Sequence, residues 1–306
     1  MTHFILAAAV AAIAVMTPGS TPASQGQQAP GARASEARAI DVYASVVDDK
    51  GAPVTGLTVA DFVVREDGVL REVLKVAPAT EPMQIALVVD DSQAATGAIP
   101  LLRDAMTDFI DKLAGKGEMS IVTVGERPTV LQGYTPSAET LKKAVGRLFA
   151  RPGSGAYLTE GIRDVSRGLA KRDGPRPVIV VLTIEAVEFS TLYYDQVLKD
   201  LYASGATLHV IGLGTRSPAM NDEMRNRNMV IVEGSDRTGG RNDALLTPQA
   251  FPDKMAQLAT ELLNQYVVTY ARPDTLVPPD RARGTVKRPG LIVRAATRAS
   301  APAAAK

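Results

Sequence analysis

Apolar segments alternate with amphipathic segments along most of the chain from residue 84 onward. Residues 85–89, 178–182 and 208–213 are short apolar runs, typical of strands buried on both faces of a parallel sheet. In 98–114 and 159–171, apolar residues recur at steps of three and four, which predicts helices with one buried face. The alternation predicts an α/β fold, Rossmann-like and doubly wound around a mostly parallel sheet.

The same patterns place further elements around this sheet. Thr135 and Pro136 suit an N-cap and a first helical residue, so a helix is predicted to begin there. The run 266–270 is predicted to be the last strand of the main sheet, while 214–254 shows no clear pattern. Other strands are predicted at 118–124 and 129–132, and other helices at 194–202 and 255–263.

Both ends of the folded region are predicted to contribute to a small β extension. Residues 40–47 are rich in β-branched side chains, and 62–65 and 69–76 flank a Glu-Asp-Gly turn as a predicted hairpin. Residues 290–294 form one more predicted strand, which we expect to pair with the N-terminal β segment.

The N-terminal residues resemble a secretory signal peptide. No Asp, Glu, Lys or Arg occurs before Arg33, and the apolar run 4–16 is followed by small residues, with cleavage expected after Ala23. A helix of that apolar run rises only about 20 Å, against a hydrocarbon core of about 30 Å. We therefore expect a secreted or periplasmic protein of the cell envelope, without a membrane span in the mature chain. Retention of the segment as an anchor is the alternative.

These patterns divide the chain into five parts. The predicted parts are 1–23, the signal peptide; 24–38, a flexible linker; 39–80, the β extension; 81–272, the main domain; and 273–306, a C-terminal segment with one strand and a disordered tail. The linker lacks an apolar period, so folding is expected to begin near Ala39.

Composition excludes several classes of function. The 34 basic and 33 acidic residues nearly cancel, so no global field favours nucleic acid. There is no cysteine, and the two histidines are His3 and His209, which excludes cysteine-ligated metals and multi-histidine zinc sites in the mature chain. His209 lies in a predicted strand, where we expect a structural role.

Motifs for catalysis are also missing. Residues 212–214 read Gly-Leu-Gly after a strand, but no third glycine follows at the spacing of a dinucleotide site, and no Walker-type loop is present. The clusters 225–227 and 281–283 are interpreted as solvated basic faces. The adjacent acids Asp90 and Asp91 leave a hydrolase as the weakest alternative. We predict no catalytic residue and no organic cofactor.

Several segments together resemble the bacterial family related to von Willebrand factor type A domains. The matching segments are 49–58, 61–62, 66–68, 86–92, 238–241, 265–270 and 287–291. They occur in the family's order across residues 40–295. The resemblance implies a type A domain with a short β extension, which meets a protein partner at the C-terminal ends of its parallel strands.

The resemblance also implies a metal-ion-dependent adhesion site, formed by an Asp-x-Ser-x-Ser loop, a distant Thr and a distant Asp around Mg²⁺. Asp90 and Ser92 match the first loop. Ala94 replaces its second serine, while Ala156 and Ile184 align with the Thr and the Asp. Because hard cations need oxygen ligands, loss of up to three of these positions predicts an incomplete site.

Two hypotheses for the function follow from this resemblance. The first is a metal-independent protein-binding or adhesion module, in which Asp90 caps the next turn and Ser92 bonds to nearby backbone. The alternative is a weakly Mg²⁺- or Ca²⁺-dependent adhesion domain that uses Asp90, Ser92 and Glu185, with Ser154 or Thr159 shifted into reach of the ion.

Overall fold

The described residues begin with the first strand of the β extension. The computed structural model describes residues 37–172, 174–215, 221–273 and 282–296. The predicted signal peptide, the linker up to residue 36 and the tail from residue 297 lie outside the described residues. Ala37 and Arg38, predicted to end the linker, already belong to strand β1.

The predicted apolar runs form strands of one sheet, which has six strands in the described residues. They are β5 (Met83–Val89), β6 (Gly117–Thr123), β7 (Thr129–Thr135), β8 (Arg176–Ile184), β9 (Thr207–Leu213) and β10 (Asn242–Leu245). Their order is β10-β9-β8-β5-β6-β7, and all neighbours are parallel except β6 and β7. β5 and β8 are buried along almost their whole length, as expected of central strands covered on both faces.

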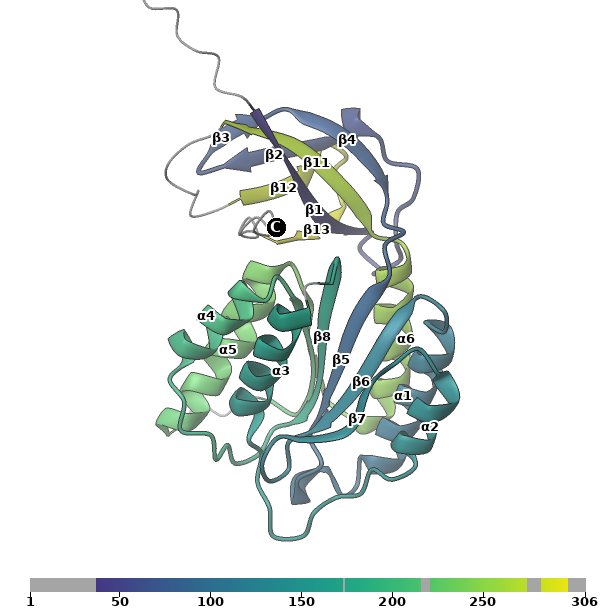
Figure 1. Cartoon of the computed structure of the whole chain (residues 1–306), viewed down its shortest axis with the longest axis vertical. Helices are drawn as coiled ribbons and strands as arrows, with labels where there is room; N and C mark the ends of the chain where they lie inside the picture. The colour runs from purple at the N-terminus through teal and green to yellow at the C-terminus, as the bar shows by residue number, and fades with distance from the viewer. Residues whose placement is uncertain (1–36, 173, 216–220, 274–281, 297–306) are drawn as a thin grey trace, which may run out of the picture. The chain divides into compact units, whose positions relative to one another are not determined.

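Helices cover both faces of this sheet (Figure 1). On one face lie α1 (Ile99–Lys112), α2 (Ala138–Val145) and α6 (Phe251–Leu263), and on the other α3 (Leu158–Arg172), α4 (Tyr194–Ala203) and α5 (Asp222–Thr238). Successive residues of β5 point to opposite faces, so Leu87 joins the apolar cluster of the first face and Val88 that of the second. The predicted doubly wound α/β fold is confirmed.

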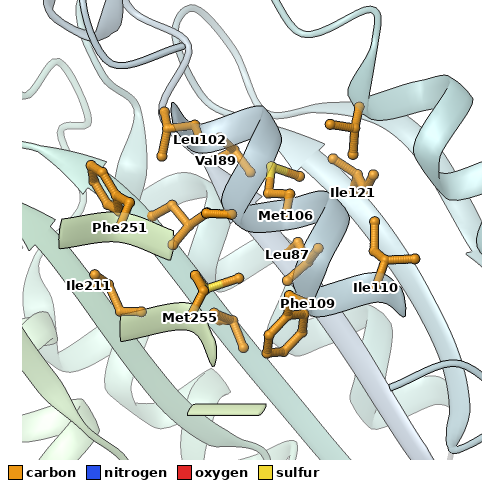
Figure 2. Close-up of a cluster of buried hydrophobic side chains, with 14 of the residues drawn as sticks. Leu87, Val89, Leu102, Met106, Phe109, Ile110, Ile121, Ile211, Phe251 and Met255 are labelled. Carbon is orange, nitrogen blue, oxygen red and sulfur yellow. The ribbon is translucent and has the colours of Figure 1, made fainter. Parts of the chain in front are cut away.

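The apolar core beneath α1 and α6 fixes the strands that carry the candidate site. Figure 2 shows Met106 and Phe109 of α1 beside Leu87 of β5, with Phe251 and Met255 of α6 completing the cluster. All five side chains are fully buried. Burial of each side chain stabilises the fold by roughly 1.5–3 kcal/mol. This packed core therefore fixes the positions of the carboxyl ends of β5 and β8.

Two small antiparallel sheets form the β extension. The first, ordered β13-β1-β11-β4, contains β1 (Ala37–Val47), β4 (Val73–Pro78), β11 (Tyr266–Pro273) and β13 (Ile292–Ala295). The second, ordered β12-β2-β3, contains β2 (Phe62–Glu66), β3 (Val69–Arg71) and β12 (Ala282–Val286). The N- and C-terminal segments thus share one β extension, as predicted.

Four details of the prediction are wrong. Residues 266–270 belong to β11, which pairs with β1 and β4 instead of joining the main sheet. Alternate residues of β11 are buried, as in a strand with one covered face. The segment 69–76 is divided at Glu72 between two sheets, and the C-terminal segment supplies two strands instead of one. Helix α2 begins after Ser137, whose side chain accepts a hydrogen bond from the Thr140 backbone, and not at Pro136.

Polar contacts join the β extension to the main domain. Gln265, between α6 and β11, donates from Nε2 to Ser45 Oγ over 2.9 Å, and its Oε1 accepts from Arg176 Nη2 at 2.6 Å. Arg294 of β13 forms an ion pair of 3.0 Å with buried Glu261 of α6. None of the described helices is both long and apolar enough to span a membrane.

Candidate functional site

The candidate site lies where the chain order of the main sheet reverses. After β5 the chain continues through α1 to β6 on one side, while β8 occupies the other side of β5. Loops that leave such neighbouring strands diverge, and open α/β sheets bind ligands at this point. Asp90 directly follows β5, and Ile184 ends β8.

Asp90 joins the ends of these two strands through its carboxylate. Oδ1 accepts a hydrogen bond from the Ser92 backbone at 2.9 Å, and Oδ2 accepts one from the Ile184 backbone at 3.2 Å. The Asp90 backbone N–H itself donates to Leu182 of β8 over 2.8 Å. With no exposed surface, Asp90 therefore acts as an acceptor for two buried backbone N–H groups.

Ser92 is buried beside Asp90, and its hydroxyl group has no hydrogen-bond partner among the described residues. The two neighbouring ligand positions carry no oxygen in their side chains. Ala94 is exposed in the short helical turn Gln93–Ala95, and buried Ala156 forms backbone hydrogen bonds with Val187 and Phe189. Among the described residues, Thr159 Oγ1 and Glu185 Oε1 are likewise unpaired. The prediction that the Ser92 hydroxyl bonds to nearby backbone is therefore wrong.

Asp91, next in the chain, is held by different partners. Its Oδ1 accepts from the Gly125 backbone at 2.6 Å, and its Oδ2 pairs with Arg151 Nε at 2.8 Å. A Cβ atom at Gly125 would lie 2.6 Å from this carboxylate oxygen, so only glycine permits the close approach. Arg151 also pairs with Glu126 at 3.0 Å. Asp90 and Asp91 therefore serve separate contacts and do not form an acid–base pair.

Glu188, in the loop between β8 and α4, caps the N-terminus of α3. Its Oε1 accepts from the Leu158 backbone at 3.0 Å and from Ser190 at 3.3 Å, with Thr159 at 3.5 Å. A carboxylate is favourable at a helix N-terminus. Burial nevertheless raises the pKa of Glu188 from 4.5 to about 7, against the opposing effects of Ser190 and Arg227. The loop of residues 185–193, called here the β8–α4 loop, is thereby tied to α3.

Arg227 of α5 reaches the same loop from the other side. Its Nη1 pairs with Glu185 Oε2 at 2.8 Å, and its Nε lies 3.7 Å from Glu188 Oε2. Its Nη2 donates to Thr183 Oγ1 at 3.1 Å and to the Ile184 carbonyl at 3.3 Å. Only 2% of the Arg227 side chain is exposed. The interpretation of residues 225–227 as a solvated basic face is therefore wrong for Arg227.

The residues at this edge do not fit a hexacoordinate divalent ion. Asp90 already accepts two backbone hydrogen bonds, and Glu185 is paired with Arg227. Ile184 offers no carboxylate, and Thr159, proposed as a shifted ligand, lies at the start of α3 beside Glu188. Among the described residues, no three His, Cys, Asp or Glu side chains form a group that could hold a metal ion. Mg²⁺ demands near-octahedral oxygen coordination, which this set does not supply.

Exposed apolar side chains surround the buried polar groups. In the β8–α4 loop, Val187 is 56% exposed, Phe189 47% and Tyr193 66%. Phe189 also packs on Tyr157, with ring centroids 5.9 Å apart. A groove of about 540 Å³ lies near Asp91 at the carboxyl end of β6, where Phe149 is exposed. The carboxyl edge of the main sheet thus combines buried, hydrogen-bonded polar groups with accessible apolar and aromatic side chains.

His209 lies away from these groups, inside β9. It is fully buried, and its Nδ1 accepts a hydrogen bond from the Arg241 backbone at 3.1 Å. Burial, together with the nearby Arg241 and Arg294 charges, lowers the pKa of His209 to about 3. The imidazole is therefore neutral at physiological pH and has no access to a substrate in solvent.

Asp90, Ser92 and Glu185 could be located from the sequence, whereas the roles of Glu188 and Arg227 could not. Glu188 aligns with none of the ligand positions of the metal-binding motif. Its spacing from β8 gives no sign that it caps α3, which begins 30 residues earlier in the chain. Arg227 gave a weak signal as part of a basic cluster, but its burial depends on the packing of α5.

Comparisons with known proteins bear on the main domain. A family model described as von Willebrand factor type A domain matches residues 85–184. No curated protein sequence matches the chain. The matched residues run from β5 to the end of β8, and thus include Asp90, Ser92 and Ile184.

Solved structures with a similar fold share little sequence with this chain. A von Willebrand factor type A protein from Catenulispora acidiphila is 12% identical, with 85% of this chain and 72% of that one covered, at a TM-score of 0.50. Proximal thread matrix protein 1 from the mussel byssus is 16% identical, with 69% and 50% covered and a TM-score of 0.49. BatB from Bacteroides thetaiotaomicron is 12% identical, with 58% and 98% covered and a TM-score of 0.44. The first of these supports the shared fold.

Proposed function

We propose that this chain, whose residues 85–184 match a family model of the von Willebrand factor type A domain, binds another protein at the carboxyl edge of its main sheet, without a divalent ion and without catalysis. The observation that supports this proposal best is the β8–α4 loop, which exposes Val187, Phe189 and Tyr193 in the same segment as the buried Glu188. Aromatic residues are enriched in protein interfaces, and exposed apolar groups beside rigid structure are typical of binding surfaces.

The independence from metal rests on how the acids at the edge are used. Asp90 accepts backbone hydrogen bonds, Asp91 pairs with Arg151, and Glu185 pairs with Arg227. These contacts use donors of the protein itself, so the edge keeps its shape without an ion. The non-catalytic role agrees with the burial of His209 and with the separate partners of Asp90 and Asp91.

We place this activity outside the cytoplasm, in the periplasm or at the cell exterior. The basis is the apolar run 4–16 with its flanking small residues. Expression of the full chain, followed by fractionation and N-terminal sequencing of the mature protein, tests this part. Recovery of the uncleaved chain in the cytoplasmic fraction would contradict it.

Capture of a partner from envelope extract tests the binding role. The full chain is immobilised, and bound proteins are compared with those held by the Val187→Ser/Tyr193→Ser double variant. We expect a protein that the wild type retains equally in EDTA and in millimolar Mg²⁺, and that the double variant loses. A partner that the wild type and the double variant retain equally would show that the binding surface does not include Val187 and Tyr193.

A weakly Mg²⁺- or Ca²⁺-dependent adhesion domain is the second candidate, favoured by one observation. The buried Ser92 hydroxyl, adjacent to Asp90, has no hydrogen-bond partner among the described residues. An ion there would have Asp90 and Ser92 as ligands, with Glu185 and either Ser154 or Thr159 as the further ligands of the predicted set. Calorimetric titration with Mg²⁺, Mn²⁺ and Ca²⁺ distinguishes the candidates, because heat that disappears in Asp90→Ala would establish the ion-dependent one.

A further inference from the structure

Arg227 is the largest of the fully buried side chains in the described part of the chain. It lies in the second turn of α5 and contacts the end of β8. A buried positive charge is strongly unfavourable unless it is paired and hydrogen-bonded. We infer that the guanidinium group of Arg227 is a built-in cation, bound by oxygen atoms at the end of β8 and in the β8–α4 loop.

The group that binds this cation consists of four oxygen atoms. Thr183 gives a hydroxyl, Ile184 a carbonyl, and Glu185 and Glu188 one carboxylate oxygen each, all within 3.7 Å of a guanidinium nitrogen. Three of them come from consecutive residues at the end of β8. A planar guanidinium presents donors in several directions at once and does not lose its proton in proteins, so it suits this arrangement better than an ammonium group.

The contacts of the Ile184 backbone show what a cation does at the end of β8. Its N–H donates to Asp90 Oδ2, and its carbonyl accepts from Arg227 Nη2. The residue that aligns with a metal-binding carboxylate is therefore held between an acidic and a basic side chain of the protein. A positive charge remains at this edge, but it is covalently attached and neither dissociates nor responds to a chelator.

Two neighbouring residues of α5 hold both ends of the β8–α4 loop. Arg227 binds Glu185 and Glu188 near its start, while the Oδ1 of Asn226 accepts a hydrogen bond from the Tyr194 backbone at 3.2 Å, where α4 begins. Helices α4 and α5 pack side by side (Figure 1). In this step the inference rests on the proposed function, because this loop is the proposed binding surface.

Chemical rescue of the full chain tests the inference. Arg227→Ala removes the guanidinium group, and the midpoint of thermal unfolding is measured with added millimolar guanidinium, with NaCl at equal ionic strength, and with Mg²⁺ or Mn²⁺. Arg225→Ala is the matched control, since Arg225 lies on the same helix with 60% of its side chain exposed. Arg227→Lys keeps the charge but loses the planar donor group.

We expect Arg227→Ala to lower the midpoint by roughly 6–20 °C, the shift that loss of one partner of a buried ion pair produces in a domain of this size. Millimolar guanidinium should raise the midpoint of Arg227→Ala by several degrees, because it binds only the folded state, whereas NaCl should not. Arg225→Ala should resemble wild type, and Arg227→Lys should be intermediate. If Arg227→Ala does not fold, the unfolding midpoint of Arg227→Lys is compared with and without guanidinium instead.

A midpoint for Arg227→Ala equal to that of wild type would overturn the inference, as would equal responses to guanidinium and NaCl. Rescue by Mg²⁺ or Mn²⁺ but not by guanidinium would also overturn it, since the oxygen atoms would then prefer a metal. These measurements need no partner. If guanidinium rescues Arg227→Ala but no partner is captured, the built-in cation is supported and only the binding role is contradicted. If a partner is captured but guanidinium does not rescue the variant, the binding role is supported and the built-in cation is contradicted.

Discussion

Arg227 Nε lies 3.7 Å from Glu188 Oε2, and the two side chains are 2% and 0% exposed. Neither atom has a hydrogen-bond partner among the described residues. When Glu188 is ionised, the pair therefore interacts through charge at a distance longer than a hydrogen bond. Oε1 of Glu188 caps α3, and the other nitrogens of Arg227 bind β8 and Glu185. A change at either residue reaches α3, α5 and the loop between β8 and α4.

Glu188 is expected to make stability depend on pH. Burial raises the pKa of Glu188 in the folded state to about 7, above its ordinary value of 4.5. Between these values the folded state keeps a proton that the unfolded state has released, so stability falls as pH rises through this window. The loss is roughly 3 kcal/mol, from 1.36 kcal/mol per pKa unit.

The comparison with Glu188→Gln isolates this effect, because glutamine does not titrate in this range. Urea unfolding of both chains is measured near pH 5 and near pH 8. The free energy of unfolding of the variant, relative to that of wild type, should increase as the pH rises. A constant difference in the free energy of unfolding between the two chains would mean that Glu188 titrates normally.

Asp90 is expected to stabilise the fold whether or not a divalent ion is present. Asp90→Ala leaves the Ser92 and Ile184 backbone N–H groups buried without their acceptor, which should cost roughly 2–4 kcal/mol. Asp104→Ala, at an exposed position of α1, is the control and should change little. Denaturant unfolding in EDTA and in Mg²⁺ measures both. A loss seen only in Mg²⁺ would identify Asp90 as a metal ligand instead.

The exposed groups of the β8–α4 loop should affect binding and not stability. Tyr193→Ser is expected to weaken partner affinity about tenfold or more, the effect of an aromatic hot spot, with an unchanged thermal midpoint. Leu70→Ser, at a position 60% exposed on β3, should change neither quantity. Surface plasmon resonance with the captured partner measures the affinities. Equal affinities for Tyr193→Ser and Leu70→Ser would exclude Tyr193 from the interface.

The two phenylalanines near α1 test the core. Phe109→Ala should destabilise the fold by roughly 3–5 kcal/mol, since the ring is fully buried and leaves a cavity. Phe149→Ala should cost less than about 1 kcal/mol, because that ring is 64% exposed and loses mainly its contact with Arg103. Calorimetry of both variants gives the two values, and similar losses would show that exposure is a poor guide here.

Much of the fold could be predicted from local patterns because its central strands and most helices bury regular apolar faces. Helix α5 escaped prediction because polar residues such as Arg227, Asn228 and Ser235 are buried on it, while Met229 and Val232 are exposed. β10 is a short edge strand with the sequence Asn-Asp-Ala-Leu, which gives almost no apolar signal. Strand β11 was detected but placed in the wrong sheet, because a run of five residues does not specify its pairing partner.

The candidate site, too, could be predicted only in part from the sequence. Asp90 and Ser92 could be located because they follow a recognisable buried strand. The partners that decide their chemistry come from distant parts of the chain: Ile184 lies 94 residues from Asp90, and Arg227 lies 42 residues from Glu185. Contacts of this kind depend on how strands and helices pack, which periodicity does not report.

The topology of the β extension bears on how the chain tolerates shortening at its C-terminus. β13 covers one side of β1, with Ala44 to Val47 paired to residues 292–295, and β12 pairs with β2. A chain that stopped before residue 282 would expose unpaired edges on both small sheets and would leave Glu261 without Arg294. Such a truncated protein would be prone to edge-to-edge aggregation even though the whole six-stranded sheet were still encoded.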